Sequence, residues 1–176
     1  FEEFSQTSKA QRLSLLLRLK SVTEARFEDL AQAMRLEMGA PISMARSDQA
    51  DAAVGHLQGF IDALEKLEEQ ITLASGDVLV REPIGVCGLI TPWNWPMNQI
   101  VLKVVPALAT GSCCILKPSE HTPISAMIYA EIIDEAGYPP GVFNLVNGDG
   151  PTVGAVLSRH ADIQMMSFTG STRAGI

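Results

Sequence analysis

The first half of the chain carries hydrophobic residues at helical spacing. Apolar side chains recur three and four positions apart at Leu13, Leu16, Leu17, Phe27, Leu30, Ala31, Met34, Met38, Ala53, Leu57, Phe60, Ile61 and Leu64. This period is typical of amphipathic helices that bury one face. Gly39 and Pro41 interrupt the pattern, because glycine adopts a left-handed cap and proline cannot continue a helix. The sequence therefore predicts three amphipathic helices within residues 1–75.

The pattern changes between residues 76 and 86. Val78 and Val80 alternate with their neighbours, and Pro83 and Gly85 then interrupt the run. Alternation of period two, bounded by proline and glycine, is typical of a strand next to a turn. We therefore expect a protruding β-hairpin over residues 76–86.

The second half of the chain contains four short apolar runs without alternation. They lie at residues 86–90, 113–116, 142–146 and 163–168, and segments of helical length separate them at 98–109, 123–136 and 151–159. Continuous apolar strands are typical of parallel sheets that are covered on both faces. We expect Thr122 to cap the second of these helices and Gly137 to end it. Strands that alternate with helices predict an α/β fold with a parallel sheet.

Composition and charge narrow the class of protein. Of the 176 residues, 47% are hydrophobic and 19% are charged, which is typical of a folded chain rather than a disordered one. No apolar run reaches the roughly 20 residues that cross a bilayer. The formal net charge is −7 and there is no basic stripe, so we expect binding neither to nucleic acid nor to a membrane surface.

Several reactive or charged residues are best interpreted as structural. Cys87, Cys113 and Cys114 lie in apolar runs and lack disulfide or metal-ligand spacing, so we expect inert core thiols, no metal and a reducing cytoplasm. The three histidines, His56, His121 and His160, have no zinc-like partners and are expected at the surface or at helix ends. The acidic side chains within residues 65–69 are expected on a solvated helix face.

Candidate chemistry lies after the strands, because ligands of an open parallel sheet bind beyond the carboxyl ends of its strands. Residues 91–96 follow the first strand and include both tryptophans of the chain, with Asn94 between them. Residue types alone favour a packed loop in which Asn94 is a turn residue. The alternative is a side-chain amide that donates to a developing oxyanion.

Two further strand ends carry polar residues. Lys117, Ser119 and Glu120 follow the second strand, and this cation and anion either bind ribose hydroxyls or remain solvated. Gly170 and Ser171 follow the fourth strand, where free backbone amides before a helix can hold phosphate. Their spacing matches neither the G-x-G-x-x-G fingerprint nor a P-loop.

Three motifs, in this order, resemble the amino-terminal part of the aldehyde dehydrogenase superfamily. They are Ile90-Thr91-Pro92-Trp93-Asn94-Trp95-Pro96, Leu116-Lys117-Pro118-Ser119-Glu120 and Phe168-Thr169-Gly170-Ser171-Thr172. The similarity extends to residues 37–41, 81–86 and 140–144 and so covers nearly the whole chain. It implies a Rossmann-like coenzyme-binding domain over residues 87–176, incomplete at its carboxyl end. Residues 1–75 would pack on that domain, and residues 76–86 would form an oligomerisation hairpin.

The resemblance also implies roles for individual residues. Asn94 would donate its amide to the oxyanion of a thiohemiacetal, and Lys117 and Glu120 would bind the adenosine ribose. The coenzyme-binding residues implied in total are Ile90, Thr91, Pro92, Trp93, Lys117, Ser119, Glu120, Phe168, Gly170 and Ser171, with Ser171 at the pyrophosphate. NAD is expected over NADP, because the Glu120 carboxylate would repel a 2′-phosphate.

The family's cysteine nucleophile and glutamate base would follow residue 172 and lie beyond Ile176. Since the chain also begins with Phe1 rather than methionine, we expect a fragment that is inactive alone. The complete enzyme would be a cytoplasmic dimer or tetramer that oxidises an aldehyde to a carboxylic acid through a thioester. Two alternatives remain: a semialdehyde or acyl-phosphate reductase of the same fold, and a non-catalytic nucleotide-binding or assembly module.

Overall fold

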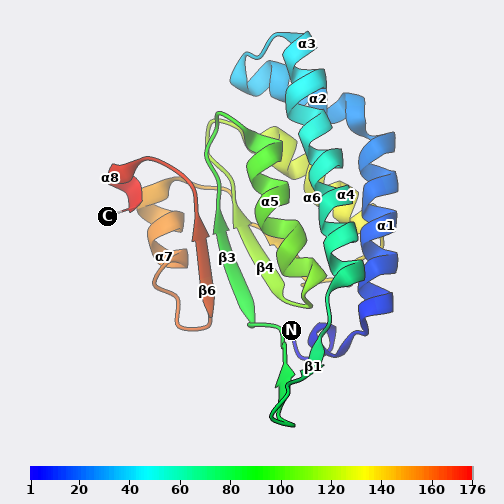
Figure 1. Ribbon diagram of the computed structural model, residues 1–176. Coiled ribbons are helices and arrows are strands. Elements are labelled where there is room, and N and C mark those ends of the chain that lie inside the picture. Colours follow the sequence, from blue (N-terminus) through cyan, green and yellow to red (C-terminus); the bar gives the residue numbers. More distant parts are fainter. Residues whose placement is uncertain (176) are drawn as a thin grey trace.

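Long helices cover one face of a four-stranded parallel sheet in the computed structural model of this protein, which describes residues 1–175 (Figure 1). The strand order is β5-β4-β3-β6, and each neighbouring pair is parallel. The strands are β3 (Val86–Ile90), β4 (Cys113–Lys117), β5 (Phe143–Leu145) and β6 (Met165–Phe168). The predicted α/β class with a parallel sheet is confirmed.

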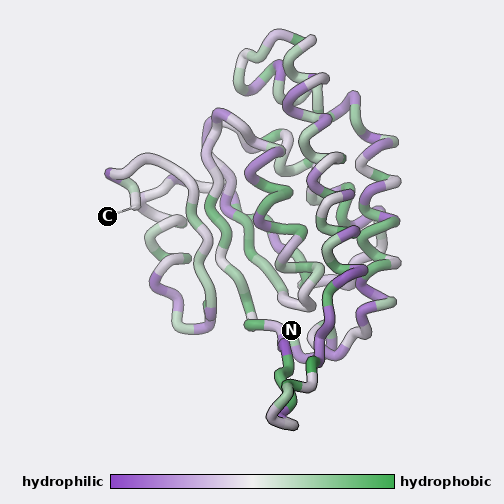
Figure 2. Tube along the Cα trace, viewed as in Figure 1, coloured by the Kyte–Doolittle hydropathy of each residue, from purple (hydrophilic) through white to green (hydrophobic). Residues whose placement is uncertain are grey.

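The amino-terminal segment is helical, as its hydrophobic period predicts. Its long helices are α1 (Lys9–Ala25), α2 (Phe27–Met38) and α4 (Asp51–Lys66), and the shorter elements are η1 (Phe4–Gln6), α3 (Ile42–Met44) and η2 (Ala45–Ala50). Ser8 begins α1 with a capping box that it forms with Gln11. Gly39 ends α2 with a left-handed φ of 72°. Figure 2 shows hydrophobic residues concentrated in β3, β4 and parts of α5, with more polar residues on the outer helices.

The helices that connect the strands lie on two faces of the sheet. Helices α5 (Pro96–Ala109) and α6 (Pro123–Glu135) pack on the same face as the amino-terminal helices. The opposite face carries η3 (Gly150–Gly154) and α7 (Ala155–Leu157), and the described chain ends in α8 (Thr172–Gly175). Helical residues thus run over 150–157, close to the helix expected over 151–159, but only Ala155–Leu157 are α-helical, because Gly150–Gly154 form a π-helix.

A hairpin projects from the body of the molecule, but it begins earlier than expected (Figure 1). Strand β1 (Gln70–Thr72) pairs antiparallel with β2 (Val78–Val80), and Ile71 lies opposite Leu79. Gly76 makes the turn with a φ of 89°. The boundary at residue 76 is thus wrong for the hairpin itself, because its first strand lies among residues that were expected to be helical. The division of the chain into three domains stays a prediction.

Only the two central strands are buried on both faces. In β3 and β4 most residues are buried, whereas β5 and β6 are half-buried, with Asn144 and Phe168 exposed. The prediction of full burial is wrong for these outer strands, because each has a neighbour on one side only. The short α7 also leaves part of that sheet face uncovered.

Helix α6 is not capped by Thr122. Thr122 occupies the N-cap position and is buried, but its hydroxyl makes no capping hydrogen bond. The carboxylate of Glu37, at the end of α2, accepts the hydrogen bonds of this helix terminus instead. Gly137 ends the helical segment with a φ of 82°, as predicted.

Candidate coenzyme site

The order in which strands are added to the sheet reverses between β3 and β6, which makes this position the topological switch point of the sheet. The connections from β3 to β4 and from β4 to β5 move outward on one side, and the chain then returns past β3 to add β6 on the other side. Open parallel sheets bind ligands beyond the strand ends at such a point. The last residues of the two strands, Ile90 and Phe168, lie opposite each other in the register. The resemblance implies that both lie at the coenzyme, and the fold brings them together.

The loop after β3 turns its tryptophans outward. Trp93 is 53% exposed and Trp95 is 36% exposed, while Thr91 is buried and its backbone N–H donates to the Lys117 carbonyl oxygen at 3.3 Å. The carbonyl oxygen of Asn94 accepts from Gln49 Nε2 at 3.4 Å, and the residue is exposed. The packed-loop interpretation is therefore wrong for the aromatic side chains. An exposed amide beside the sheet end remains consistent with an oxyanion donor.

The turn after β4 holds a cation and an anion together. Lys117 is 2% exposed, and its Nζ donates to the Pro118 carbonyl oxygen at 2.9 Å and to Glu120 Oε2 at 3.3 Å. The pKa of the Glu120 carboxyl is lowered, first by its own backbone N–H and then by the Lys117 ammonium. Ser119 is buried, and its Oγ accepts from the His121 N–H at 3.3 Å. Glu120 therefore presents a charged carboxylate at the strand end.

A groove of about 650 Å³ runs beside the switch point. Its lining comes from β3, β6 and three elements on the same face, and comprises Ile90, Gly150, Pro151, Gly154, Ala155, Ser158, Met166, Phe168, Arg173, Ala174 and Gly175. A Cβ placed on Gly154 would lie 3.8 Å from Ile90 Cδ1 and 3.9 Å from Lys117 Cδ. The start of α7 therefore packs close to both candidate strand ends.

Sequence reasoning identified part of this groove and missed the rest. Of the ten coenzyme residues that the resemblance implies, Ile90 and Phe168 line it. The other eight lie outside its lining in the part of the chain that the structure describes, and they are Thr91, Pro92, Trp93, Lys117, Ser119, Glu120, Gly170 and Ser171. The missed residues include Gly150, Pro151 and Gly154. The sequence feature that could have identified them is a proline at a helix start with a glycine on either side. Glycines there permit close backbone approach, but this feature does not by itself indicate a ligand.

Gly170 lies against a neighbouring ring. A Cβ on Gly170 would lie 2.5 Å from Phe168 Cζ, so the exposed Phe168 ring would have to move to admit a side chain. Ser171 is exposed, and its carbonyl oxygen accepts from Ala174 and Gly175 at the start of α8. These two predicted residues adjoin the groove wall formed by Arg173 and Phe168.

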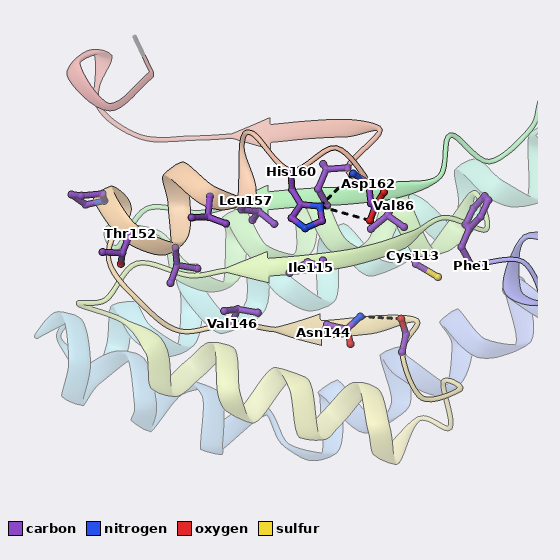
Figure 3. Close-up of a pocket in the computed structure, with 15 residues that line it drawn as sticks. Phe1, Val86, Cys113, Ile115, Asn144, Val146, Thr152, Leu157, His160 and Asp162 are labelled. Carbon is purple, nitrogen blue, oxygen red and sulfur yellow. Dashed lines mark hydrogen bonds and ion pairs between the residues drawn. The ribbon is translucent and has the colours of Figure 1, made fainter.

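A larger apolar cavity, of about 900 Å³, runs along the sheet face that carries η3 and α7, from Phe1 and Val86 to Val146 and Thr152 (Figure 3). Its lining includes Val86 and Cys113, the first residues of β3 and β4, together with Asn144, Leu157 and His160. Ligands of parallel sheets bind beyond the carboxyl ends of the strands, where Ile90 and Phe168 line the smaller groove, whereas the larger cavity covers the sheet face as far as the amino ends. The smaller groove is therefore the better candidate for a coenzyme site.

The cysteines are core residues, as predicted. All three are buried, and burial raises the pKa of the Cys87 and Cys114 thiols. Residues 1–175 contain no cluster of three or more histidine, cysteine, aspartate or glutamate side chains that could hold a metal ion. No helix in the same range is long and apolar enough to cross a membrane.

Two of the other structural interpretations need correction. His56 is half-buried, and its Nε2 lies 2.5 Å from Asn98 Oδ1, so it links α4 to α5 rather than facing solvent. Glu69 lies beyond the end of α4 and accepts from the buried guanidinium of Arg12. The prediction that Glu69 lies on a solvated helix face is therefore wrong.

The family model for the aldehyde dehydrogenase family matches residues 1–176. The chain therefore belongs to this family. It is 53% identical over 176 residues to 3-succinoylsemialdehyde-pyridine dehydrogenase of a Pseudomonas species, covering 99% of this chain and 37% of that protein.

Solved structures show the same relationship. The aldehyde dehydrogenase of Bartonella henselae superimposes with a TM-score of 0.96 at 50% identity, over 99% of this chain and 37% of its own. Aldehyde dehydrogenase C of Pseudomonas syringae, solved with NAD⁺ and octanal, has a TM-score of 0.96 at 49% identity, over 99% and 36%. The chain thus spans slightly more than a third of the length of these relatives.

Proposed function

We propose that these residues form the coenzyme-binding and oxyanion-stabilising part of an NAD-dependent aldehyde dehydrogenase. The reaction is the oxidation of an aldehyde to a carboxylic acid through a cysteine thiohemiacetal and a thioester. The observation that carries the proposal is the Lys117–Glu120 pair, joined at 3.3 Å at the end of β4 beside the switch point. Family membership and the similarity to a dehydrogenase solved with NAD⁺ support it.

The side chains present fit NAD. The Glu120 carboxylate can accept hydrogen bonds from two ribose hydroxyls, and the Lys117 ammonium can donate to one. Ile90 and Phe168 offer apolar walls, and Ser171 offers a hydroxyl and a backbone N–H to the pyrophosphate. NAD supplies the hydride acceptor when it is bound.

Asn94 is proposed as the oxyanion donor. Its exposed amide follows the β3 end at a short distance along the chain, where it can meet an aldehyde oxygen as negative charge develops. The attacking cysteine and the glutamate base are assigned to residues outside this sequence, because Cys87, Cys113 and Cys114 are buried.

The hairpin is proposed to join subunits into a dimer or tetramer, in the cytoplasm. Val78, Leu79 and Val80 are exposed on β2, at 57%, 40% and 51%. A short apolar strand with free backbone groups readily pairs with or packs against another chain. Sedimentation of the full-length protein tests this assembly.

Calorimetry of the full-length protein that contains this sequence, combined with NADH formation from a panel of aldehydes, tests the activity. We expect NAD to bind, and we expect Lys117→Met to weaken that binding about tenfold, which corresponds to one lost charge-assisted contact. Lys20→Met is the matched control, since it removes an ammonium group that pairs with Glu24 on the surface of α1.

Three results would contradict parts of the proposal. If Lys117→Met and Lys20→Met weaken NAD binding equally, Lys117 is not part of the site. Reduction of acyl phosphates without aldehyde oxidation would favour the reductase alternative. Coenzyme binding with no turnover on any aldehyde would favour the assembly module.

A further inference from the structure

Glu37 is placed where the local rules for helices disfavour it. It lies in the last turn of α2, two residues before the left-handed Gly39. A carboxylate there opposes the negative end of its own helix dipole. The side chain is also half-buried, and this burial raises its pKa. A charged group in such a position needs compensation from another element.

The compensation comes from the amino terminus of α6. Glu37 Oε2 accepts from the Ile124 N–H at 2.6 Å, and Oε1 accepts from the Ser125 N–H at 3.1 Å and from the Ser125 hydroxyl. These backbone N–H groups belong to the first turn of α6, where a helix has no internal partners for them. Glu37 therefore caps a helix that lies 87 residues away in the sequence.

Helix α6 has no cap from its own sequence. Pro123 occupies its first turn and has no N–H to donate. The Thr122 hydroxyl is buried and unpaired among the described residues. A cap in the usual position would have used this hydroxyl, which accepts readily when the backbone allows it. The first turn of α6 is therefore held from outside by α2.

The first turn of α6, which Glu37 holds, directly follows the connection that carries Glu120. Only residues 118–122 separate Lys117 from α6. The Lys117 ammonium fixes the start of this turn through the Pro118 carbonyl oxygen, and the Thr122 N–H donates to the Ser119 carbonyl oxygen at 3.1 Å near its end. Glu120 lies between these two anchors, and its side chain is 48% exposed.

We propose that Glu37 is a positioning residue that sets the place of Glu120, and hence coenzyme affinity, by anchoring the first turn of α6 to α2. This inference rests on the proposed function. A shift of that turn moves the Glu120 carboxylate relative to Lys117, which is buried in the sheet and stays in place. Hydrogen bonds between ribose hydroxyls and a carboxylate weaken steeply when their geometry changes.

Glu37→Gln in the full-length protein tests the proposal. The amide keeps the size of the side chain but presents one acceptor oxygen and one NH2 group, which can only donate, to a helix end that offers only donors. We expect the dissociation constants of NAD and of AMP, which carries the adenosine ribose alone, to rise together by roughly five- to twentyfold. The KM for NAD should rise by the same factor, with kcat and the KM for the aldehyde unchanged.

Two further variants separate positioning from general stability. Glu28→Gln removes a carboxylate of the same helix whose partner is Arg46, and it should leave both dissociation constants unchanged. In a Glu120→Gln background, Glu37→Gln should have almost no further effect on AMP binding, because the carboxylate that it positions has lost its charge. If Glu37→Gln does not fold, Ser125→Ala removes only one hydroxyl donor and should show the same pattern at a smaller size.

Each outcome is decisive. Unchanged AMP binding in Glu37→Gln or, failing that variant, in Ser125→Ala would overturn the positioning role while leaving the proposed function intact. Additive losses in the double variant would also overturn it. A wild-type protein that binds neither NAD nor AMP would overturn the proposed function, and the positioning role with it.

Discussion

The Nε atom of Arg12 lies 2.9 Å from the carbonyl oxygen of Ala109, so a side chain of α1 satisfies the last turn of α5. The same guanidinium donates to the Thr7 carbonyl oxygen and to the Glu69 carboxylate, although only 4% of it is exposed. Its planar guanidinium group contacts Thr7, Glu69 and Ala109, which belong to segments that are distant from one another in the sequence. Arg12 thus ties α1, the end of α5 and the base of the hairpin together.

Arg12→Lys should lower the free energy of unfolding by about 2–4 kcal/mol. A lysine ammonium is a single point and cannot reach all three acceptors, so buried carbonyl groups lose their donors. Urea unfolding of the full-length protein measures the change, with the exposed Arg18→Lys as control. Equal stability of the two variants would show that the Arg12 contacts contribute little.

Asn94→Ala should slow aldehyde oxidation by roughly 10² to 10³, or about 3–4 kcal/mol, with NAD affinity nearly unchanged. The reason is that its amide acts only as charge develops on the aldehyde oxygen. Steady-state rates together with NAD titration measure both quantities. Loss of NAD binding with normal acylation would instead assign Asn94 to a turn role.

Glu120→Gln should narrow the preference for NAD over NADP, chiefly by improving NADP binding. The carboxylate would face the 2′-phosphate as a second anion, while Lys117 offsets part of the repulsion, so NADP is a poorer ligand rather than an excluded one. Titration of both coenzymes against the wild type and the variant measures the ratio. A wild-type preference for NADP would remove Glu120 from the ribose site.

Replacing Cys87, Cys113 and Cys114 with alanine or serine in the full-length protein should leave acylation intact if the variant folds. All three thiols are buried, and burial raises the pKa of Cys87 and Cys114, which disfavours the reactive thiolate. For the same reason the 176-residue chain alone should not oxidise aldehydes. Loss of the acyl-enzyme burst in a folded variant would place the nucleophile among these cysteines.

Glu28→Gln should reduce thermal stability near neutral pH, and the difference should shrink in acid. Hydrogen bonds from Arg46, and then from Gln32, lower the pKa of Glu28 from 4.5 to about 2. A pKa that is lower in the folded state stabilises the protein above the unfolded value, and this contribution is lost as the pH falls from about 4.5 toward 2.

The unfolding temperatures of the wild type and the Glu28→Gln variant, measured between about pH 6 and about pH 3, test this prediction. Because the side chains of Arg46 and Glu28 are about half exposed, at 50% and 52%, added salt should also reduce the difference. A difference that is independent of both pH and salt would mean that the Glu28→Gln substitution acts through the helix and not through the ion pair.

The pattern of apolar residues along the chain is enough to predict the longer helices and the central strands. Hydrophobic period sets the helices α2 and α4, which bury one face, and continuous apolar runs set the central strands β3 and β4, which are mostly buried. In α1 the period predicts the helix, but Leu17, which belongs to the predicted apolar stripe, is 52% exposed. The candidate site follows from the same logic, since residues after parallel strands share one edge of the sheet. The sequence therefore predicts that the ends of these strands are neighbours, and the register pairs Ile90 with both Lys117 and Phe168.

Contacts between segments that are distant along the chain arise only when the elements pack together. The cap of α6 by Glu37 and the partnership of Arg12 with Glu69 join residues 87 and 57 positions apart, and each breaks a local expectation about the residues concerned. The approach of Gly154 to Lys117 and Ile90 is of the same kind. Hydrophobic period specifies which face of an element is buried, but only packing specifies which donor meets which acceptor.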